Sequence, residues 1–184
     1  MKKSGSPDEA LETEVSELET IGRWGTDLSV FHSIKASSTL ARTQLAILLL
    51  RYFPQLAEVR KAPQIITDVQ DSASFSEIQT VVGNGLLDLR PNRTFQPAAT
   101  VTRGEFASAL ARLIGKLGIA PIPAPPVPLA DVASSNARYR EIQTVLAYGL
   151  LKVDDAGNFD VNGVISGEDA IRAIGRVLEL SRGK

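Results

Sequence analysis

The stretch EIQTVVGNGLL (77–87) returns 64 residues later as EIQTVLAYGLL (141–151). The likeness continues downstream, where TVTRGEFASALARLI (100–114) shares its apolar positions with VISGEDAIRAIGRVL (164–178). Self-similarity at one fixed spacing is typical of repeat architectures, in which each copy is one supersecondary unit. The fold is therefore expected to be built from copies of a single unit.

A third and weaker copy lies near the start of the chain. ELETIGRWG (17–25) aligns with EIQTVVGNG, and TLARTQLAILLLRYF (39–53) aligns with TVTRGEFASALARLI. Three repeats are predicted from this alignment, at residues 1–60, 61–120 and 121–184. Because one such repeat cannot bury its apolar face alone, the three are expected to form one compact module.

Each repeat is predicted to consist of a helix, an irregular loop and a second helix. Apolar residues recur in the first helices at spacings of three and four, as in Ile78, Val81 and Val82. This is the period of one helical face. Gly85 and Gly149 follow at the place where a glycine with positive φ ends a helix. No stretch shows sustained alternation of apolar and polar residues, so the predicted fold class is all-α, with three helix-loop-helix repeats.

Two further expectations concern the ends of these units. The first helix of the first repeat is predicted from Pro7 to about Trp24, with His32 in the loop that follows. Between the second and third repeats, IAPIPAPPVPL (119–129) is typical of a stiff polyproline II segment. A role as a ligand for an aromatic-lined groove is the weaker alternative, because the same segment must join two neighbouring repeats.

Composition excludes several classes of function. Lys and Arg (20) nearly balance Asp and Glu (21), so the chain lacks the basic excess of a non-specific nucleic-acid binder. The longest apolar run, at 45–50, is far shorter than the roughly 20 residues of a membrane span. There is no cysteine and only one histidine, which leaves little material for nucleophilic catalysis or a metal site. No signal peptide is recognisable at the start of the chain.

Four segments of the middle repeat resemble the S-layer homology family of bacterial cell-surface modules: ITDV (66–69), EIQTVVGNGLL (77–87), RPNRTFQP (90–97) and VTRGEF (101–106). The resemblance implies a pseudo-threefold helical bundle made of three repeats. It also implies that grooves between the repeats bind an anionic cell-wall polymer, often through a pyruvate ketal on a terminal sugar.

The resemblance also implies which residues contact the polymer. The arginine of the family's TRAE motif corresponds to Arg103 in the second repeat and Arg42 in the first, whereas the third repeat has Gly167. The family's early tryptophan is replaced by Ala73 and Ala137. At most two of the three grooves are therefore expected to be competent.

Capping explains the neighbours of Arg103 but not Arg103 itself. Thr102 with Glu105, and Ser166 with Asp169, have the spacing of helix capping boxes and are expected to be structural. An arginine in the first turn of a helix opposes the helix dipole. Arg103 is therefore expected to have an anionic partner.

Two kinds of partner remain open for Arg103. One is a protein carboxylate, with Asp68 and Asp131 as the internal candidates, which would form an Arg–Asp clasp between repeats. The other is a sugar-borne carboxylate, which a guanidinium binds through two parallel hydrogen bonds. Asp68 and Asp131 also count among the candidate glycan-binding residues, together with Arg42, Arg103 and Trp24. Core packing is the competing interpretation of Trp24.

One metal motif is rejected. Residues 158–169 imitate an EF-hand loop, but the segment begins with Asn158, ends on the short Asp169 and has no helix leading into it. No metal or cofactor is expected.

The function predicted from these observations is that of a non-catalytic module that anchors a protein at the bacterial cell surface or cell wall, outside the cell. Its partner would be a cell-wall polysaccharide or peptidoglycan-linked polymer, for example a pyruvylated one, and the module would belong to a larger surface protein. The alternative is a degenerate copy of the fold that acts as a protein–protein scaffold. That alternative requires Arg42 and Arg103 both to be buried in intramolecular pairs. A helical hydrolase that uses Asp and Glu pairs has no feature in its favour beyond their presence.

Overall fold

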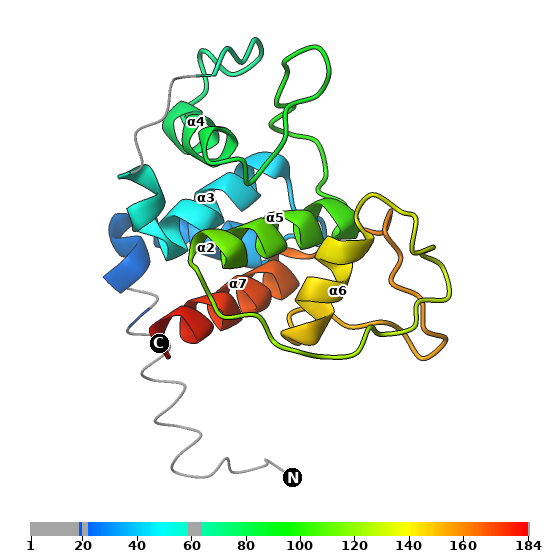
Figure 1. Ribbon diagram of the computed structural model, residues 1–184. Coiled ribbons are helices and arrows are strands. Elements are labelled where there is room, and N and C mark those ends of the chain that lie inside the picture. Colours follow the sequence, from blue (N-terminus) through cyan, green and yellow to red (C-terminus); the bar gives the residue numbers. More distant parts are fainter. Residues whose placement is uncertain (1–18, 20–21, 59–63, 184) are drawn as a thin grey trace, which may run out of the picture.

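The computed structural model describes residues 19, 22–58 and 64–183, which form a helical body with long loops (Figure 1). The predicted helix at 7–24 lies mostly outside the described residues. In chain order the elements are the 3₁₀-helix η1 (Gly25–Asp27), α2 (Leu28–Lys35), α3 (Arg42–Tyr52), the 3₁₀-helix η2 (Pro54–Ala57), α4 (Phe75–Gly83), α5 (Arg103–Lys116), α6 (Tyr139–Ala147) and α7 (Gly167–Arg182). The described parts of the chain contain no β-strand, so the predicted all-α class is confirmed for them.

Side-chain hydrogen bonds cap the first turns of α5 and α7. Thr102 caps α5 by accepting a hydrogen bond from the Glu105 N–H (3.1 Å), and the Glu105 carboxylate accepts one from the Thr102 N–H (3.3 Å). Ser166 caps α7 in the same way through the Asp169 N–H (3.1 Å). These bonds satisfy N–H groups that the first turn of a helix leaves without intrahelical partners.

Glycines end the first helices of the second and third repeats. Gly85 and Gly149 lie just beyond the last turns of α4 and α6, with φ of 69° and 65°. Residues other than glycine are strained at such angles. The chain therefore turns at the same register position in both repeats, and the buried leucines that follow enter the core (Leu86, Leu87, Leu150 and Leu151).

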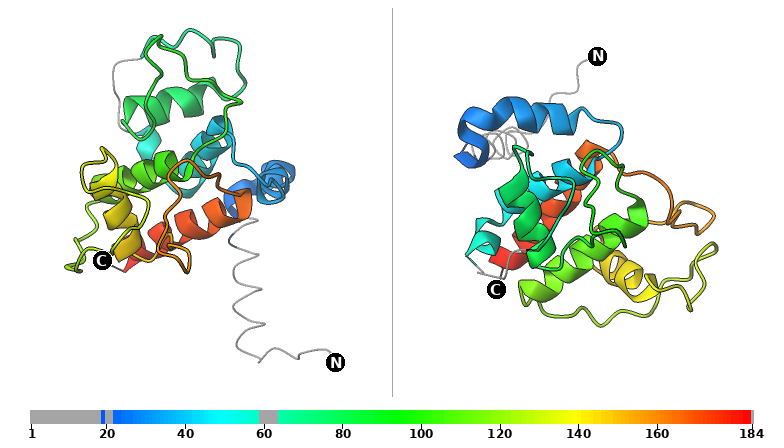
Figure 2. Two further views of the ribbon diagram at one scale, coloured as in Figure 1. Left: turned by 90° about the vertical axis from the view of Figure 1, so that its right-hand side faces the viewer. Right: turned by 90° about the horizontal axis from the view of Figure 1, so that it is seen from above.

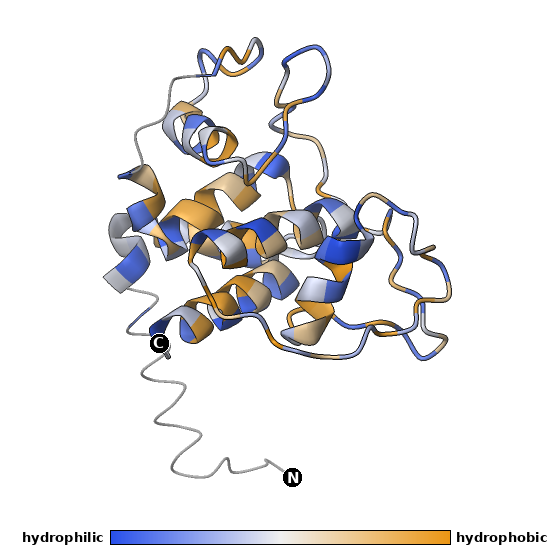
Figure 3. Cartoon of the chain, viewed as in Figure 1, coloured by the Kyte–Doolittle hydropathy of each residue, from blue (hydrophilic) through white to orange (hydrophobic). Residues whose placement is uncertain are grey.

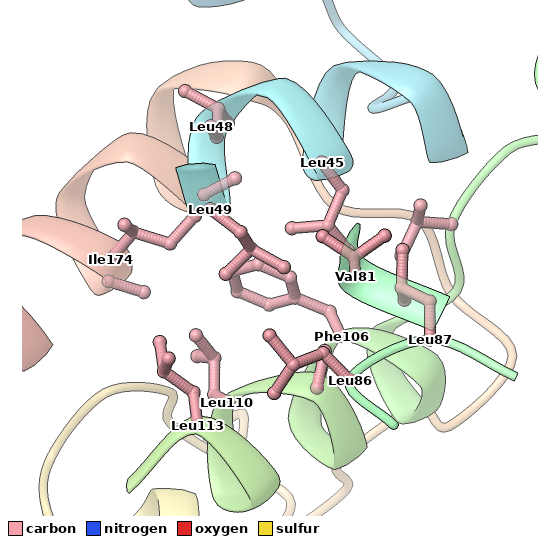
Figure 4. Close-up of a cluster of buried hydrophobic side chains, with 14 of the residues drawn as sticks. Leu45, Leu48, Leu49, Val81, Leu86, Leu87, Phe106, Leu110, Leu113 and Ile174 are labelled. Carbon is pink, nitrogen blue, oxygen red and sulfur yellow. The ribbon is translucent and has the colours of Figure 1, made fainter. Parts of the chain in front are cut away.

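The second helices of the three predicted repeats, α3, α5 and α7, carry the centre of the core. Both α3 and α5 pack against α7, and apolar residues concentrate on the inward sides of α3 and α7 (Figure 3). Figure 4 shows the Phe106 ring between the leucines of α3 and Leu86, with Leu110, Leu113 and Ile174 beside it. These residues are fully or almost fully buried.

The first helices lie outside this centre, each against the second helix of the preceding repeat. Helix α4 packs on α3 and α6 packs on α5, as the views of Figure 2 show, while α2, which follows the segment aligned with α4 and α6, packs on α7. Backbone hydrogen bonds link the three repeats just before their second helices, from Val101 N to Leu40 O and from Leu40 N to Ile165 O (both 2.8 Å). This order of contacts is compatible with a closed ring of three repeats, and the pseudo-threefold symmetry itself stays a prediction.

The first repeat departs from the expected plan in one respect. His32 was expected in a loop, but it is exposed on the helix α2, whose buried face is formed by Phe31 and Ile34. The helix-loop-helix plan has an irregular segment between the two helices of each repeat, and the first repeat has a helix there instead. The apolar spacing of three between Phe31 and Ile34 is enough for a short helix to dock on α7.

The proline-rich segment has no regular secondary structure and runs along the surface from the end of α5 to α6 (Figure 1). The Gln143 side chain binds both backbone groups of Val127, at 2.8 Å each, and the Tyr148 hydroxyl donates to Ala120 O at 2.6 Å. In the second repeat, Gln79 binds the backbone of Gln64 in the same way (3.0 and 2.7 Å). The glutamine of each EIQTV stretch thus holds the incoming chain on the first helix.

Candidate functional site

Arg103 extends from the first turn of α5 into the long loop of the third repeat. Its Nε donates to Phe159 O and its Nη2 to Lys152 O, both at 2.9 Å. The guanidinium lies 5.0 Å from the centre of the Phe159 ring, within cation–π distance. The side chain is half-buried. Two backbone carbonyls and a ring therefore fix the direction in which Arg103 presents its charge.

Arg42 makes the same set of contacts one repeat earlier. Its Nε donates to Phe95 O (2.7 Å), its Nη2 donates to Asp88 O (2.6 Å), and its guanidinium lies 4.6 Å from the Phe95 ring centre. Phe95 and Asp88 occupy the register positions of Phe159 and Lys152. Each arginine thus joins the second helix of one repeat to the loop of the next.

The two arginines differ in how deeply their side chains are buried. Only 2% of the Arg42 side chain is exposed, and its Nη1 lies 3.5 Å from Glu105 Oε1. The same Glu105 oxygen accepts from Arg90 at 2.8 Å. Burial lowers the pKa of Arg42, and the Glu105 carboxylate partly offsets that effect. Arg42 is therefore a buried and internally neutralised cation.

Asp68 and Asp131 hold the loops that the arginines contact. The Asp68 carboxylate accepts from the N–H groups of Phe95 and Gln96, both at 2.7 Å. Asp131 accepts from Phe159 and Asp160, at 2.8 and 2.7 Å. The Arg–Asp clasp between repeats is not formed, because each aspartate is bound to backbone N–H groups and each arginine to backbone carbonyls.

A groove lies between Arg103 and the third repeat. It encloses about 510 Å³, and we name it the Arg103 groove. Its lining comprises Arg103, Gly149, Leu150, Leu151, Lys152, Ile165, Asp169, Arg172, Ala173 and Arg176. Four of these side chains are cationic and one is a carboxylate, so the lining has a clear positive excess. A concave, positively charged surface attracts anions and concentrates them.

The corresponding space beside Arg42 is nearly closed, with a volume of about 50 Å³. Arg112 crosses it and binds Asp88 at 2.9 Å and Glu141 at 3.2 Å, and Ser108 donates to Glu141 as well. Burial acts to lower the pKa of Arg112, but the hydrogen bonds and charges of Asp88 and Glu141 outweigh it and raise that pKa. Arg90 and Arg112, two cations beside Arg42, are thus paired with carboxylates of the protein.

Comparison with models of known protein families gives matches over residues 65–107 and 128–171. Both segments match the S-layer homology domain. Domains of this family are cell-wall-binding modules of cell-surface proteins, which points to anchoring on cell-wall polymers. A search of curated proteins finds no match to the chain.

The two S-layer homology segments contain most of the Arg103 groove. The first includes Arg103, and the second includes Lys152 and Asp169, whereas Arg172 and Arg176 lie just beyond its end. Arg42 and Trp24 lie outside both segments. The family match and the open groove therefore coincide at the boundary between the second and third predicted repeats.

The predicted site residue Trp24 and the position of the missing third arginine, Gly167, are both enclosed by protein. Trp24 is 1% exposed and packs against Phe31 at 5.4 Å between ring centres, so the indole offers no surface to a sugar. Gly167 donates its N–H to Ser37 O (2.9 Å), and a Cβ there would lie 1.7 Å from Ile34 O. An arginine at position 167 is therefore sterically excluded.

Sequence reasoning missed the groove-lining residues of α7. Arg172 and Lys152 stand where the second repeat has Ser108 and Asp88, and the alignment of the repeats contains this signal. A larger hollow of about 680 Å³ lies between α3 and the end of α7, but its lining has two glutamates beside its three arginines.

Neither a cluster of metal ligands nor a membrane-spanning helix is found in the part of the chain that the structure describes. In residues 19, 22–58 and 64–183 no three His, Asp or Glu side chains gather in a way that could hold a metal ion. Nor do these residues include a helix long and apolar enough to span a membrane.

Replacing Asp131 with alanine should destabilise the loop that supports Arg103. The change removes two charge-assisted hydrogen bonds, and we expect the free energy of unfolding to fall by about 1–3 kcal/mol. Asp131→Asn keeps one acceptor oxygen and should lose less. Urea denaturation measures both, and equal unfolding midpoints for Asp131→Ala and the parent would contradict the assignment.

Proposed function

We propose that this protein is a non-catalytic module that binds an anionic cell-wall polysaccharide, such as a pyruvylated one, in the Arg103 groove. The observation that carries the proposal is an open groove with four cations and one carboxylate, located where two S-layer homology segments meet. The module would anchor a larger protein at the bacterial cell surface.

The chemistry of Arg103 supports this choice of ligand. Nε and one terminal nitrogen hold backbone carbonyls, so the guanidinium is fixed while it still faces the groove. No carboxylate lies within ion-pair distance of Arg103 among the residues that the structure describes. A guanidinium is weakly hydrated and suits recognition of a planar carboxylate. A sugar-borne carboxylate would therefore accept the hydrogen bonds that the remaining N–H groups of Arg103 can donate.

The protein–protein scaffold is the alternative, and the two arginines discriminate between them. The scaffold requires both to be buried in intramolecular pairs. Arg42 meets that condition through Glu105, whereas Arg103 is half-buried and bound only to backbone carbonyls and a ring. This difference favours a ligand at Arg103, and it assigns Arg42 to the interface between repeats.

The organisation of the binding body follows from the same contacts. We include the segment up to about residue 60 as a first repeat, because α3 occupies the place of α5 and α7 and its Arg42 repeats the contacts of Arg103. Three repeats around α3, α5 and α7 would form a pseudo-threefold body with one open groove.

Arg103→Ala should weaken binding to purified bacterial sacculi while leaving the fold intact. Loss of one charge-assisted contact should remove about 1.5–3 kcal/mol of binding free energy, or roughly tenfold to a hundredfold in affinity. Co-sedimentation with sacculi, before and after chemical removal of their acidic polymer, measures this loss. Arg140→Ala is the matched control, because Arg140 is exposed on α6 and does not line the groove.

Three outcomes would count against the proposal. These are equal sedimentation of the parent protein with sacculi that lack the acidic polymer, failure of the parent to sediment with untreated sacculi, and binding of Arg103→Ala equal to that of Arg140→Ala. A thermal melt of each variant separates loss of binding from loss of folding.

A further inference from the structure

The Arg103 groove holds more positive charge than one carboxylate can use. Arg103 lies on one wall, and α7 supplies Arg172 and Arg176 to the other. Lys152 adds a fourth cation beside them, and Asp169 is the one acidic group among the described residues of the lining. One anion at Arg103 would leave Arg172 and Arg176 paired only with exposed carboxylates of their own helix.

Comparison of the repeats shows how this surplus arises. In the second repeat the position of Arg172 is Ser108, which binds Glu141, and the position of Lys152 is Asp88. Asp88 binds Arg112, the counterpart of Arg176, at 2.9 Å. In the third repeat, Lys152 stands at the position of Asp88 and cannot form an ion pair with an arginine. Arg176 pairs instead with Glu179 on its own helix (2.7 Å).

The pairs that the α7 arginines do form are exposed and exchangeable. Arg172, which is 69% exposed, lies 2.9 Å from Asp169 and 3.9 Å from Glu168. Arg176 is 56% exposed. Surface ion pairs of this kind contribute little to stability and are screened by salt. An incoming anion can therefore replace the carboxylates without disturbing the fold.

We infer that the ligand of the Arg103 groove is a polyanionic glycan that presents two acidic groups at once, an inference that rests on the proposed function of this groove. Arg103 binds the first group, and the second lies between Arg172 and Arg176. These two arginines are four residues apart on α7, a rise of about 6 Å, so they share one helical face. Arg172 is then a specificity-determining residue for polymers with closely spaced charges.

The test compares galacturonic acid with digalacturonic acid, which carry one and two carboxylates. Each is titrated into the full chain and followed by NMR chemical shifts. The parent should bind the disaccharide about tenfold more tightly than the monosaccharide, and high salt should reduce that advantage. Arg172→Ala should lose about tenfold for the disaccharide and keep its affinity for the monosaccharide, while Arg140→Ala should match the parent for both.

The inference is overturned if the parent binds both acids equally, if it binds neither, or if Arg172→Ala retains the preference for two carboxylates. These results are independent of the proposed function, which fails only in the sacculus experiment. A chain that sediments through Arg103 but shows no preference for the disaccharide would have a single-anion groove.

Discussion

Replacing Gly167 with alanine should strongly destabilise the protein. A Cβ at this position would lie 1.7 Å from Ile34 O and 2.7 Å from Ile34 C, and both atoms belong to the backbone of α2. The start of α7 would have to move away from the end of α2, with loss of the Gly167–Ser37 hydrogen bond. Overpacking of a buried site costs about 1–3 kcal/mol and sometimes more, and this contact lies at the upper end.

Differential scanning calorimetry measures the effect. A loss of about 3 kcal/mol should lower the Tm of a chain of this size by roughly 6–12 °C. Gly175→Ala, also in α7, is the matched control because its Cβ would meet nothing closer than Tyr52 Cε1 at 3.9 Å. Alanine is the better helix former there and should raise stability by about 0.5–1 kcal/mol. Equal melting of the parent and Gly167→Ala would contradict the close approach of α2 and α7.

Gly167 also illustrates a limit of comparison between repeats. From the alignment, glycine at this position reads as loss of the TRAE arginine and hence of a groove. The structure shows a positive reason for glycine, since the helix start lies against the carbonyl of Ile34. That contact joins residues far apart in the chain, and no local pattern near position 167 contains it.

Local chemistry, by contrast, could be read directly from the sequence. The capping residues Thr102 and Ser166 act within one turn, and Gly85 and Gly149 act on their own backbone, so each depends on neighbours that the sequence itself displays. The common plan of the repeats places His32 in a loop, but the apolar spacing of Phe31 and Ile34 supports the short helix α2 instead.

The contacts of Arg42 and Arg103 could be predicted from the sequence only in part. An anionic partner is expected for Arg103 in the first turn of its helix, but the structure shows a carboxylate beside Arg42, Glu105, and backbone carbonyls beside Arg103. The main partners of both arginines are nevertheless backbone carbonyls, which carry no side-chain signal in a sequence. The difference between the open and the closed groove depends on Asp88 against Lys152 and Ser108 against Arg172, and those positions matter only once α5, α6 and α7 are placed in space.

Arg42→Ala should therefore lower the free energy of unfolding and not the affinity for the polymer. The change leaves the carbonyls of Phe95 and Asp88 without their donor and leaves Glu105 with Arg90 as its remaining partner. Removal of one member of a buried ion pair costs about 3–5 kcal/mol. Urea denaturation should show this loss, and Arg103→Ala, at a half-buried position without an ion pair, should lose clearly less. Sacculus binding by Arg42→Ala should fall only in proportion to its unfolded fraction.

A double-mutant cycle decides whether Arg42 holds the interface through Glu105. Glutamine at position 105 still suits the capping box, so Glu105→Gln removes mainly the charge that faces Arg42 and Arg90. The two changes should be non-additive by about 0.5–3 kcal/mol, because the second removes an interaction that the first has already broken. Additive losses would show that Arg42 does not stabilise the interface through Glu105. An Arg42→Ala variant that keeps full stability and still loses sacculus binding would instead make Arg42 a ligand-binding residue.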